Sequence, residues 1–149
     1  VYHLPIVLIL HCDNMSLSTK HTKQVMKMSI LNLTQHAATP EQLEAGVIDL
    51  MQHDLASLKE LLNFVGLPTA DEIYERAYAI AALAENLFAE TVMVGGAPFL
   101  MPVLQKALQM RGITVLYAFS ERVSIEKIVD GVVVKTNEFK HVGFVEVFI

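Results

Sequence analysis

The stretch Ile113-Thr-Val-Leu-Tyr-Ala-Phe-Ser-Glu-Arg122 constrains the fold most, because it is apolar for seven residues and then becomes polar. The residues before it, ending in Arg111-Gly112, have the pattern of a helix closed by a glycine. A helix, a glycine, a buried strand and a polar strand end, in that order, are typical of an open α/β sheet. We therefore expect a strand over Ile113–Phe119, with Ser120 and Arg122 at a rim that would suit an anionic ligand. Many strands end in polar residues simply because they reach water, and this alternative stays open.

Composition limits the class of protein. With 149 residues, of which 53% are hydrophobic and 18% charged, the chain suits one globular domain. A net charge of −5 argues against binding of extended DNA or RNA, but a small anionic ligand is compatible with it. The single cysteine, Cys12, excludes an internal disulfide and a Cys-rich zinc site. His36, His53 and His141 are far apart in the sequence and fit no metal motif, so we expect neither a metal nor a cofactor.

Residues 1–27 differ from the rest of the chain. The apolar run Leu4–Leu10 is too short to span a bilayer and lacks the features of a secretory signal. We expect a cytoplasmic protein with no membrane partner, in which residues 1–27 are an upstream extension and residues 28–149 form a single domain. An additional edge strand over residues 5–10 is the competing interpretation.

From Met28 the pattern becomes regular. Thr39-Pro-Glu-Gln42 and Thr69-Ala-Asp-Glu72 have the form of capping boxes that open helices, and Gly46 suits a left-handed helix stop. Strands are expected over Ile30–Thr34, 47–50, Thr91–Val94 and Ile113–Phe119, with a terminal hairpin formed by Val132–Lys135 and Val142–Phe148. Helices are expected over 39–45, 54–64, 69–89 and from Pro98 or Pro102 to Met110. The order predicts a three-layer, Rossmann-like α/β domain with a mostly parallel sheet and a C-terminal β-hairpin.

Polar or glycine residues follow three of these strands, at ends that would meet on one edge of the sheet. They are Thr34-Gln35-His36, Gly95-Gly96 and Ser120-Glu-Arg122. We expect Gly95 and Gly96 to offer backbone N–H groups at a helix N-terminus, which favours an anion. Each element also has a plain structural interpretation, such as a tight turn for the glycine pair, and the glycines do not form a GxGxxG dinucleotide motif.

Two stretches of the chain resemble small stand-alone CRISPR-associated proteins of the CARF (CRISPR-associated Rossmann fold) type, some of which are ring nucleases. The first is Leu33-Thr-Gln-His-Ala-Ala-Thr-Pro-Glu-Gln42. The second is Leu116-Tyr-Ala-Phe-Ser-Glu-Arg122, continuing through Glu126, Asp130-Gly131 and Lys135 to Phe139-Lys-His-Val-Gly-Phe144. Phe119-Ser120 stands where the family pattern often has two hydroxyl residues. Similar small proteins occur in phages and prophages.

The resemblance implies a homodimer that binds a cyclic oligoadenylate, a small anionic nucleotide, across its two-fold axis. It also implies metal-independent cleavage, in which a ribose 2′-OH attacks the neighbouring phosphodiester. Under it, the catalytic residues are His36 as acid or base, Ser120 as a hydroxyl donor and Arg122 as the phosphate cation. The resemblance also implies that the ligand is bound by Thr34, Gln35, Gly95, Gly96, Ser120 and Arg122. A nucleotide sensor or sponge that does not cut, and an oligomeric structural or interaction protein, remain the alternatives.

Overall fold

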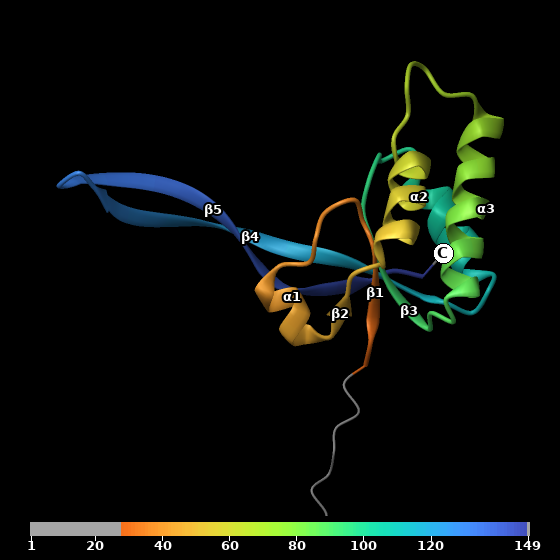
Figure 1. Cartoon of the computed structure of the whole chain (residues 1–149), viewed down its shortest axis with the longest axis horizontal. Helices are drawn as coiled ribbons and strands as arrows, with labels where there is room; N and C mark the ends of the chain where they lie inside the picture. Colours follow the sequence, from red (N-terminus) through yellow and green to blue (C-terminus); the bar gives the residue numbers. More distant parts are fainter. Residues whose placement is uncertain (1–27, 149) are drawn as a thin grey trace, which may run out of the picture.

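The computed structural model describes residues 28–148, which form one five-stranded sheet with helices packed against it (Figure 1). The expectations for residues 1–27, including the possible strand over 5–10, lie outside the described residues. The strands are β1 (Ile30–Leu33), β2 (Val47–Ile48), β3 (Thr91–Val94), β4 (Thr114–Val129) and β5 (Val132–Glu146). The helices are α1 (Pro40–Ala45), α2 (Gln52–Leu62), α3 (Ala70–Asn86) and α4 (Met101–Gln109). The α/β class, the mostly parallel sheet and a C-terminal hairpin are confirmed. The expected pairing of Val132–Lys135 with Val142–Phe148 is wrong, because Val132–Lys135 and residues 142–146 both belong to β5, which pairs with β4.

The strand order is β2-β1-β3-β4-β5, in which β5 alone is antiparallel to its neighbour. The chain moves from β1 to β2 on one side and then returns to β3 on the other side of β1. Because crossovers between parallel strands are right-handed, α1 must lie on the face opposite to α2, α3 and α4. Figure 1 shows α1 on one side of the parallel strands and α2 and α3 on the other. The direction of winding therefore reverses between β1 and β3.

The main core fills the space between the sheet and the three helices α2, α3 and α4. Leu58, Ile80 and Leu104, one from each helix, are fully buried together with Leu33 and Val92 of the sheet. A smaller cluster on the α1 face contains Ile30, Val47, Met93 and Leu116. Because both faces of the sheet bury apolar side chains, the central strands are continuous apolar runs in the sequence.

Local signals in the sequence set the helix ends as expected at α1. Thr39 accepts a hydrogen bond from the backbone N–H of Gln42, and the Gln42 side chain accepts one from the N–H of Thr39, which completes the capping box. Gly46 ends the helix at φ 103°, a left-handed conformation that costs glycine little. Thr69 caps α3 through the N–H of Glu72, but the Glu72 side chain pairs with Arg76 instead of completing a second box.

The expected end of the fourth strand at Phe119 is wrong. β4 continues to Val129 and pairs with β5 along its whole length, apart from a bulge between Phe119 and Ser120. Both strands leave the body of the protein and form a long arm, which we define as residues 120–142 (Figure 1). The turn expected at Asp130-Gly131 is confirmed, with both residues at positive φ. Pairing with β5 keeps the polar residues after Phe119 in an extended conformation. The change from apolar to polar residues therefore does not mark the end of the strand.

No helix within residues 28–148 is long and apolar enough to cross a membrane.

Candidate functional site

A crevice opens where the winding of the sheet reverses, at the C-terminal ends of β1 and β3. In open α/β sheets this is the position at which ligands bind, because the loops from the two strands diverge to opposite faces there. The hollow has a volume of about 460 Å³. Its lining consists of Thr34, Gln35, His36, Ala37, Thr39, Gln42, Met93, Val94, Gly95, Gly96, Tyr117 and Ala118. We call it the switch-point crevice.

Buried Asn32, in the middle of β1, shapes the loop that forms one wall of the crevice. Its Nδ2 donates to the carbonyl of His36 at 2.8 Å and to Oδ1 of Asp49 at 2.7 Å. Its Oδ1 accepts from the N–H and the hydroxyl of Thr34 at 2.9 and 2.7 Å. Asp49 in turn accepts from the N–H of Ala38. All four hydrogen-bonding positions of the amide are filled, so the loop from Thr34 to Ala38 is held in one conformation.

The opposite wall consists of Gly95 and Gly96, which follow β3. A Cβ added at Gly95 would lie 3.3 Å from Cγ2 of Thr34, so the absence of a side chain keeps this part of the crevice open. A turn over residues 97–100 separates the glycines from α4, which begins at Met101. The expected position of Gly95-Gly96 directly at a helix N-terminus is therefore wrong, and the later start, with Pro102 in the first turn, is the one realised.

Tyr117 lines both this crevice and a second hollow of about 430 Å³, and Gly95 and Gly96 also line both. The second hollow extends over Pro98, Met101, Pro102 and Gln105. The Tyr117 hydroxyl donates to Oε1 of Gln105 at 2.9 Å, and Nε2 of Gln105 donates to the carbonyl of Val147 at 2.6 Å. Burial raises the pKa of the Tyr117 phenol, so it stays a neutral donor. This chain of hydrogen bonds fixes β4, α4 and the end of the described chain relative to the crevice.

Donors without a permanent positive charge dominate the crevice. Among the described residues that line it there is no lysine or arginine, and His36 is its only imidazole. Outside it, a hydrogen bond from its own backbone N–H and one from the Thr39 hydroxyl lower the pKa of Glu41. Lys140 and His141 lower it further, because the base of the arm lies near α1. An anionic ligand in the crevice would therefore meet hydroxyl, amide and backbone N–H groups first.

The structure brings together five of the residues singled out in the sequence and leaves two outside. Thr34, Gln35, His36, Gly95 and Gly96 line the switch-point crevice. Ser120 and Arg122 do not line it. They lie on the arm, where Ser120 is opposite His141 and Arg122 stacks over the ring of Phe139 at 6.0 Å. The reason is the length of β4, which carries both residues past the edge of the sheet at which β1 and β3 end.

Sequence reasoning did not identify Asn32, Asp49 or Tyr117 as parts of this site. Asn32 gives the clearest signal in retrospect, since it is an amide between Leu31 and Leu33 in an otherwise apolar strand. A buried amide needs partners, and a functional loop is a common place for them. Asp49 has no comparable local signal, because its partner is 17 residues away.

Within residues 28–148, no three His, Cys, Asp or Glu side chains are grouped closely enough to hold a metal ion.

Comparison with known proteins identifies the family. A family model described as "Uncharacterized protein MJ1673 family" matches residues 28–145, so the chain belongs to that family. No curated protein and no solved structure matches the chain significantly.

Proposed function

We propose that this member of the uncharacterized MJ1673 family binds a small anionic nucleotide in the switch-point crevice. The observation that carries the proposal is the convergence of Thr34, His36, Gly95 and Gly96 where the winding of the sheet reverses. This is where doubly wound sheets bind nucleotides, and a strand order of 2-1-3-4-5 is one of their common forms. The proposal places the protein in the cytoplasm, because nucleotides are abundant there.

The two adjoining hollows suit the two halves of a nucleotide. Met93, Val94, Pro98 and Met101 give apolar surface on which a purine ring can pack. The hydroxyl of Thr34, the Gln35 and Gln42 amides and the backbone at Gly95-Gly96 supply polar groups for ribose and phosphate. With volumes of about 460 and 430 Å³, both hollows lie within the usual range for ligand sites.

The resemblance to CARF-type proteins narrows the proposed ligand to a cyclic oligoadenylate, as part of a CRISPR-associated or phage-borne system. Cleavage would proceed by attack of a ribose 2′-oxygen on the adjacent phosphorus, with loss of the 5′-oxygen. The 2′-OH proton passes to a base, the 5′-oxygen receives a proton, and the products are a 2′,3′-cyclic phosphate and a 5′-hydroxyl. His36, exposed at the crevice, is the group proposed to carry one of these protons.

Binding without cleavage is the second candidate, and one observation favours it. The reaction benefits from both an acid and a base, whereas His36 and Tyr117 are the only titratable side chains among the described residues that line the crevice. Burial raises the pKa of Tyr117, which makes its phenol a poor base at neutral pH. The crevice thus offers one imidazole for two proton transfers. A sensor or sponge, which binds without cutting, would have the same crevice.

The test incubates the purified chain with cyclic tri-, tetra- and hexa-adenylate in EDTA. Binding is measured by calorimetry and products by chromatography. Linear or 2′,3′-cyclic-phosphate products that are lost in His36→Ala, while binding is retained, support cleavage. Binding without products supports the sensor. If none of the three rings binds at about 100 µM, the nucleotide proposal fails and an interaction protein remains.

Two glycines provide a matched pair of variants for locating the site. Gly95→Ala places a methyl group in the crevice, 3.3 Å from Thr34. Gly143→Ala adds the same group on β5 with no atom within 4 Å. We expect Gly95→Ala to weaken nucleotide binding at least ten-fold, about 1.4 kcal/mol, and Gly143→Ala to leave it unchanged. Equal effects of the two variants would place the ligand elsewhere.

A further inference from the structure

The arm projects from the body with one edge of β4 unpaired. Beyond Tyr117, β5 is the only strand paired with β4 among the described residues, so the other edge of β4 has open backbone groups. From Tyr117 to Val129 an extended strand covers roughly 40 Å. An isolated two-stranded ribbon is only marginally stable in water, and an open edge invites another strand.

Apolar side chains on both faces of the arm are exposed to solvent. Ile128, Val133 and Phe139 lie on one face and are 78%, 59% and 75% exposed. Val129 and Val132 are opposite each other on the second face and are more than half exposed. Exposed apolar surface of this extent on a projecting element is characteristic of an interaction site.

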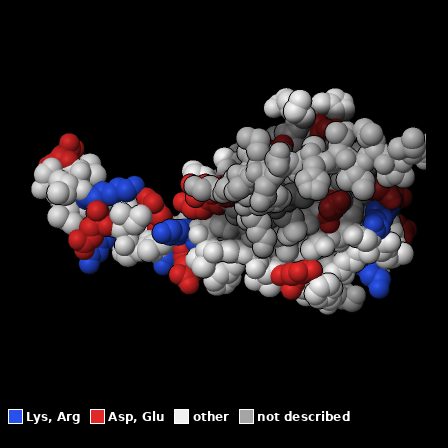
Figure 2. Space-filling view, turned by 90° about the horizontal axis from the view of Figure 1, so that it is seen from below, with Lys and Arg blue, Asp and Glu red and all other residues white. Residues whose placement is uncertain are grey.

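The charge pattern of the arm indicates which kind of partner would bind it. Acidic and basic side chains are interspersed along its length (Figure 2), in contrast to the net charge of −5 of the whole chain. Four acidic residues, Glu121, Glu126, Asp130 and Glu138, balance four basic ones, Arg122, Lys127, Lys135 and Lys140. A neutral, alternating pattern suits a partner that has the same pattern.

The order of charges on β4 is self-complementary. The segment reads Glu121-Arg-Val-Ser-Ile-Glu-Lys127. When two copies are placed antiparallel with Ser124 opposite Ser124, Glu121 faces Lys127, Arg122 faces Glu126, and Val123 faces Ile125. Every charge of this segment then meets its opposite, and the two pairs that flank the central Ser124, each of Val123 with Ile125, are apolar. Two-fold symmetry in one sheet requires a residue to face its own copy, so few registers are available.

Neighbouring registers lose this match. Centring on Val123 or on Ile125 places Glu121 opposite Ile125 or Val129. On the outer edge of β5, a centre at Thr136 places Lys135 opposite Asn137 and Glu138 opposite Val134. Centres at Asn137 and Glu138 place Lys135 opposite Phe139 and His141. None of these alternatives pairs opposite charges. A centre at Phe139 on β5 pairs Glu138 with Lys140, which gives two contacts between opposite charges, against four for the centre at Ser124.

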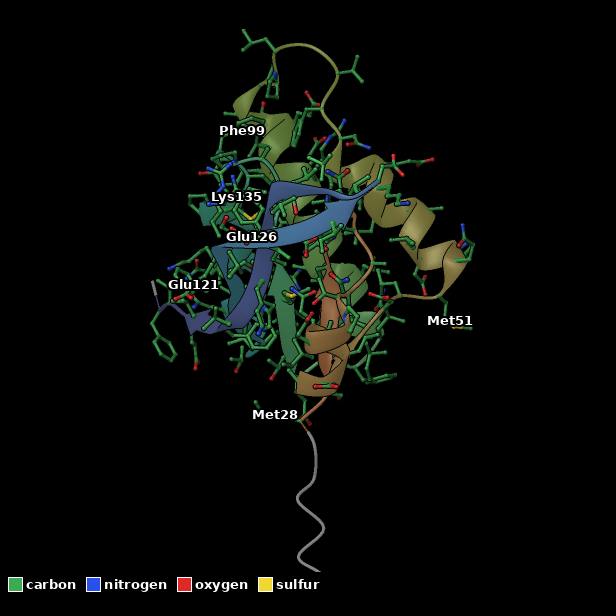
Figure 3. All side chains as sticks on the ribbon, turned by 90° about the vertical axis from the view of Figure 1, so that its left-hand side faces the viewer. Met28, Met51, Phe99, Glu121, Glu126 and Lys135 are labelled. Carbon is green, nitrogen blue, oxygen red and sulfur yellow. The ribbon has the colours of Figure 1, made fainter. Side chains whose placement is uncertain are left out.

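We propose that two copies of this chain associate through the free edges of their β4 arms, antiparallel and centred on Ser124, to form a four-stranded sheet. Two ion pairs within each arm extend into the new contact: Lys127–Glu138 at 2.6 Å and Lys135–Glu126 at 3.4 Å. Glu126 and Lys135 lie on the two neighbouring strands of the arm in Figure 3. Glu121 of one copy thus joins Lys127 and Glu138 of the other in a three-residue charge ladder across the sheet.

The same register connects the dimer to the crevice. It places Val129 of the second copy opposite Phe119 of the first, so the following Asp130-Gly131 turn comes against the end of β3, where Val94 already pairs with Tyr117. Ala118 and Tyr117 line the switch-point crevice, and β3 ends beside Tyr117. The turn of the second copy therefore lies in line with β3, at the mouth of the crevice. Each dimer would then have two separate crevices, one at each end of the shared arm, instead of the single site on the two-fold axis that the resemblance implies.

The first test uses charge reversal and needs no ligand, so its result is independent of the proposed function. In Arg122→Glu, two copies would place Glu opposite Glu126, and in Glu126→Arg they would place Arg opposite Arg122. In a mixture of the two variants, each of these contacts joins a glutamate to an arginine. By analytical ultracentrifugation of the full chain we expect a wild-type dimer, at least ten-fold weaker self-association of each variant, and recovery on mixing.

The second test is a cross-link. In a Cys12→Ser background, Ser124→Cys would place two thiols opposite each other at a Cα separation of about 4.5–5.5 Å, which a disulfide can bridge. Ser120→Cys, on the same strand face, is the control, since the register puts it opposite Ile128. We expect oxidation to link Ser124→Cys and not Ser120→Cys. A monomeric wild-type chain at about 100 µM, a dimer indifferent to both reversals, no recovery on mixing, or equal cross-linking at both positions would overturn the proposal.

Discussion

Asn32 shows how one residue determines the shape of the crevice. Its amide fills four hydrogen bonds that connect β1, the loop after it and Asp49 before α2. An apolar side chain at this position would fit the strand as well, so the amide serves the loop rather than the core. The apolar pattern around it predicts the strand equally well with or without this amide, so the prediction of the strand does not reveal its role.

We expect Asn32→Ala to lower the free energy of unfolding by about 2–3 kcal/mol, since it leaves the Thr34 hydroxyl and Asp49 without their buried partner. Asn137→Ala, at an exposed position on the arm, is the control and should change it by less than about 0.5 kcal/mol. Urea denaturation followed by circular dichroism measures both. Equal effects would show that the hydrogen bonds of Asn32 do not stabilise the fold.

Tyr117 leads to a prediction about pH. Because burial raises its pKa, the folded state favours the neutral phenol. Its contribution to stability is therefore complete below the pKa of an unfolded tyrosine, about 10, and is lost as the pH rises through the higher folded value. Tyr117→Phe should cost about 1 kcal/mol at pH 7 by leaving Oε1 of Gln105 unpaired. It should also remove one alkaline step from the ultraviolet titration, and an unchanged titration would contradict this assignment.

The elements with local signals were predictable from the sequence, and those that depend on distant pairing were not. The capping box at Thr39, the stop at Gly46 and the Asp130-Gly131 turn each depend on a few adjacent residues. The length of β4 depends on its pairing with β5, in which Glu121, for example, is opposite Lys140. No local pattern distinguishes a polar strand end from a polar arm, which is why Ser120 and Arg122 were expected at the ligand site.

The junction of α2 and α3 depends on one arginine. Nη1 of Arg76 donates to the carbonyls of Glu60, Leu61 and Asn63 at the end of α2, and its guanidinium lies 4.5 Å above the ring of Phe64. We expect Arg76→Met to cost about 2–3 kcal/mol, because carbonyls at the helix end lose a charged donor. Arg122→Met, on the arm, should cost less than about 1 kcal/mol in the isolated monomer. Thermal denaturation in dilute solution tests the difference, and similar losses would refute the role of Arg76.

For the whole molecule, the proposed dimer contact and the folded core lie in different parts. The two buried clusters lie in the body, and the arm contributes residues to neither beyond its base. Removing residues 121–140 and joining Ser120 to His141 through Asn-Gly should preserve the circular dichroism of the helices, since these two residues are already cross-strand partners. The melting temperature of the intact chain should rise with protein concentration, whereas that of the shortened chain should not. A concentration-dependent melting temperature in the shortened chain would place the dimer contact in the body.

If the reversal of winding between β1 and β3 creates a nucleotide site, a bound nucleotide must perturb the backbone around the switch-point crevice. This can be measured by titrating the isotopically labelled full chain with cyclic tetra-adenylate and recording amide NMR spectra. We expect saturable shifts at Thr34, Gln35, His36, Gly95 and Gly96, with the outer face of α3 unaffected. Saturable shifts confined to residues outside the crevice would contradict the proposed site.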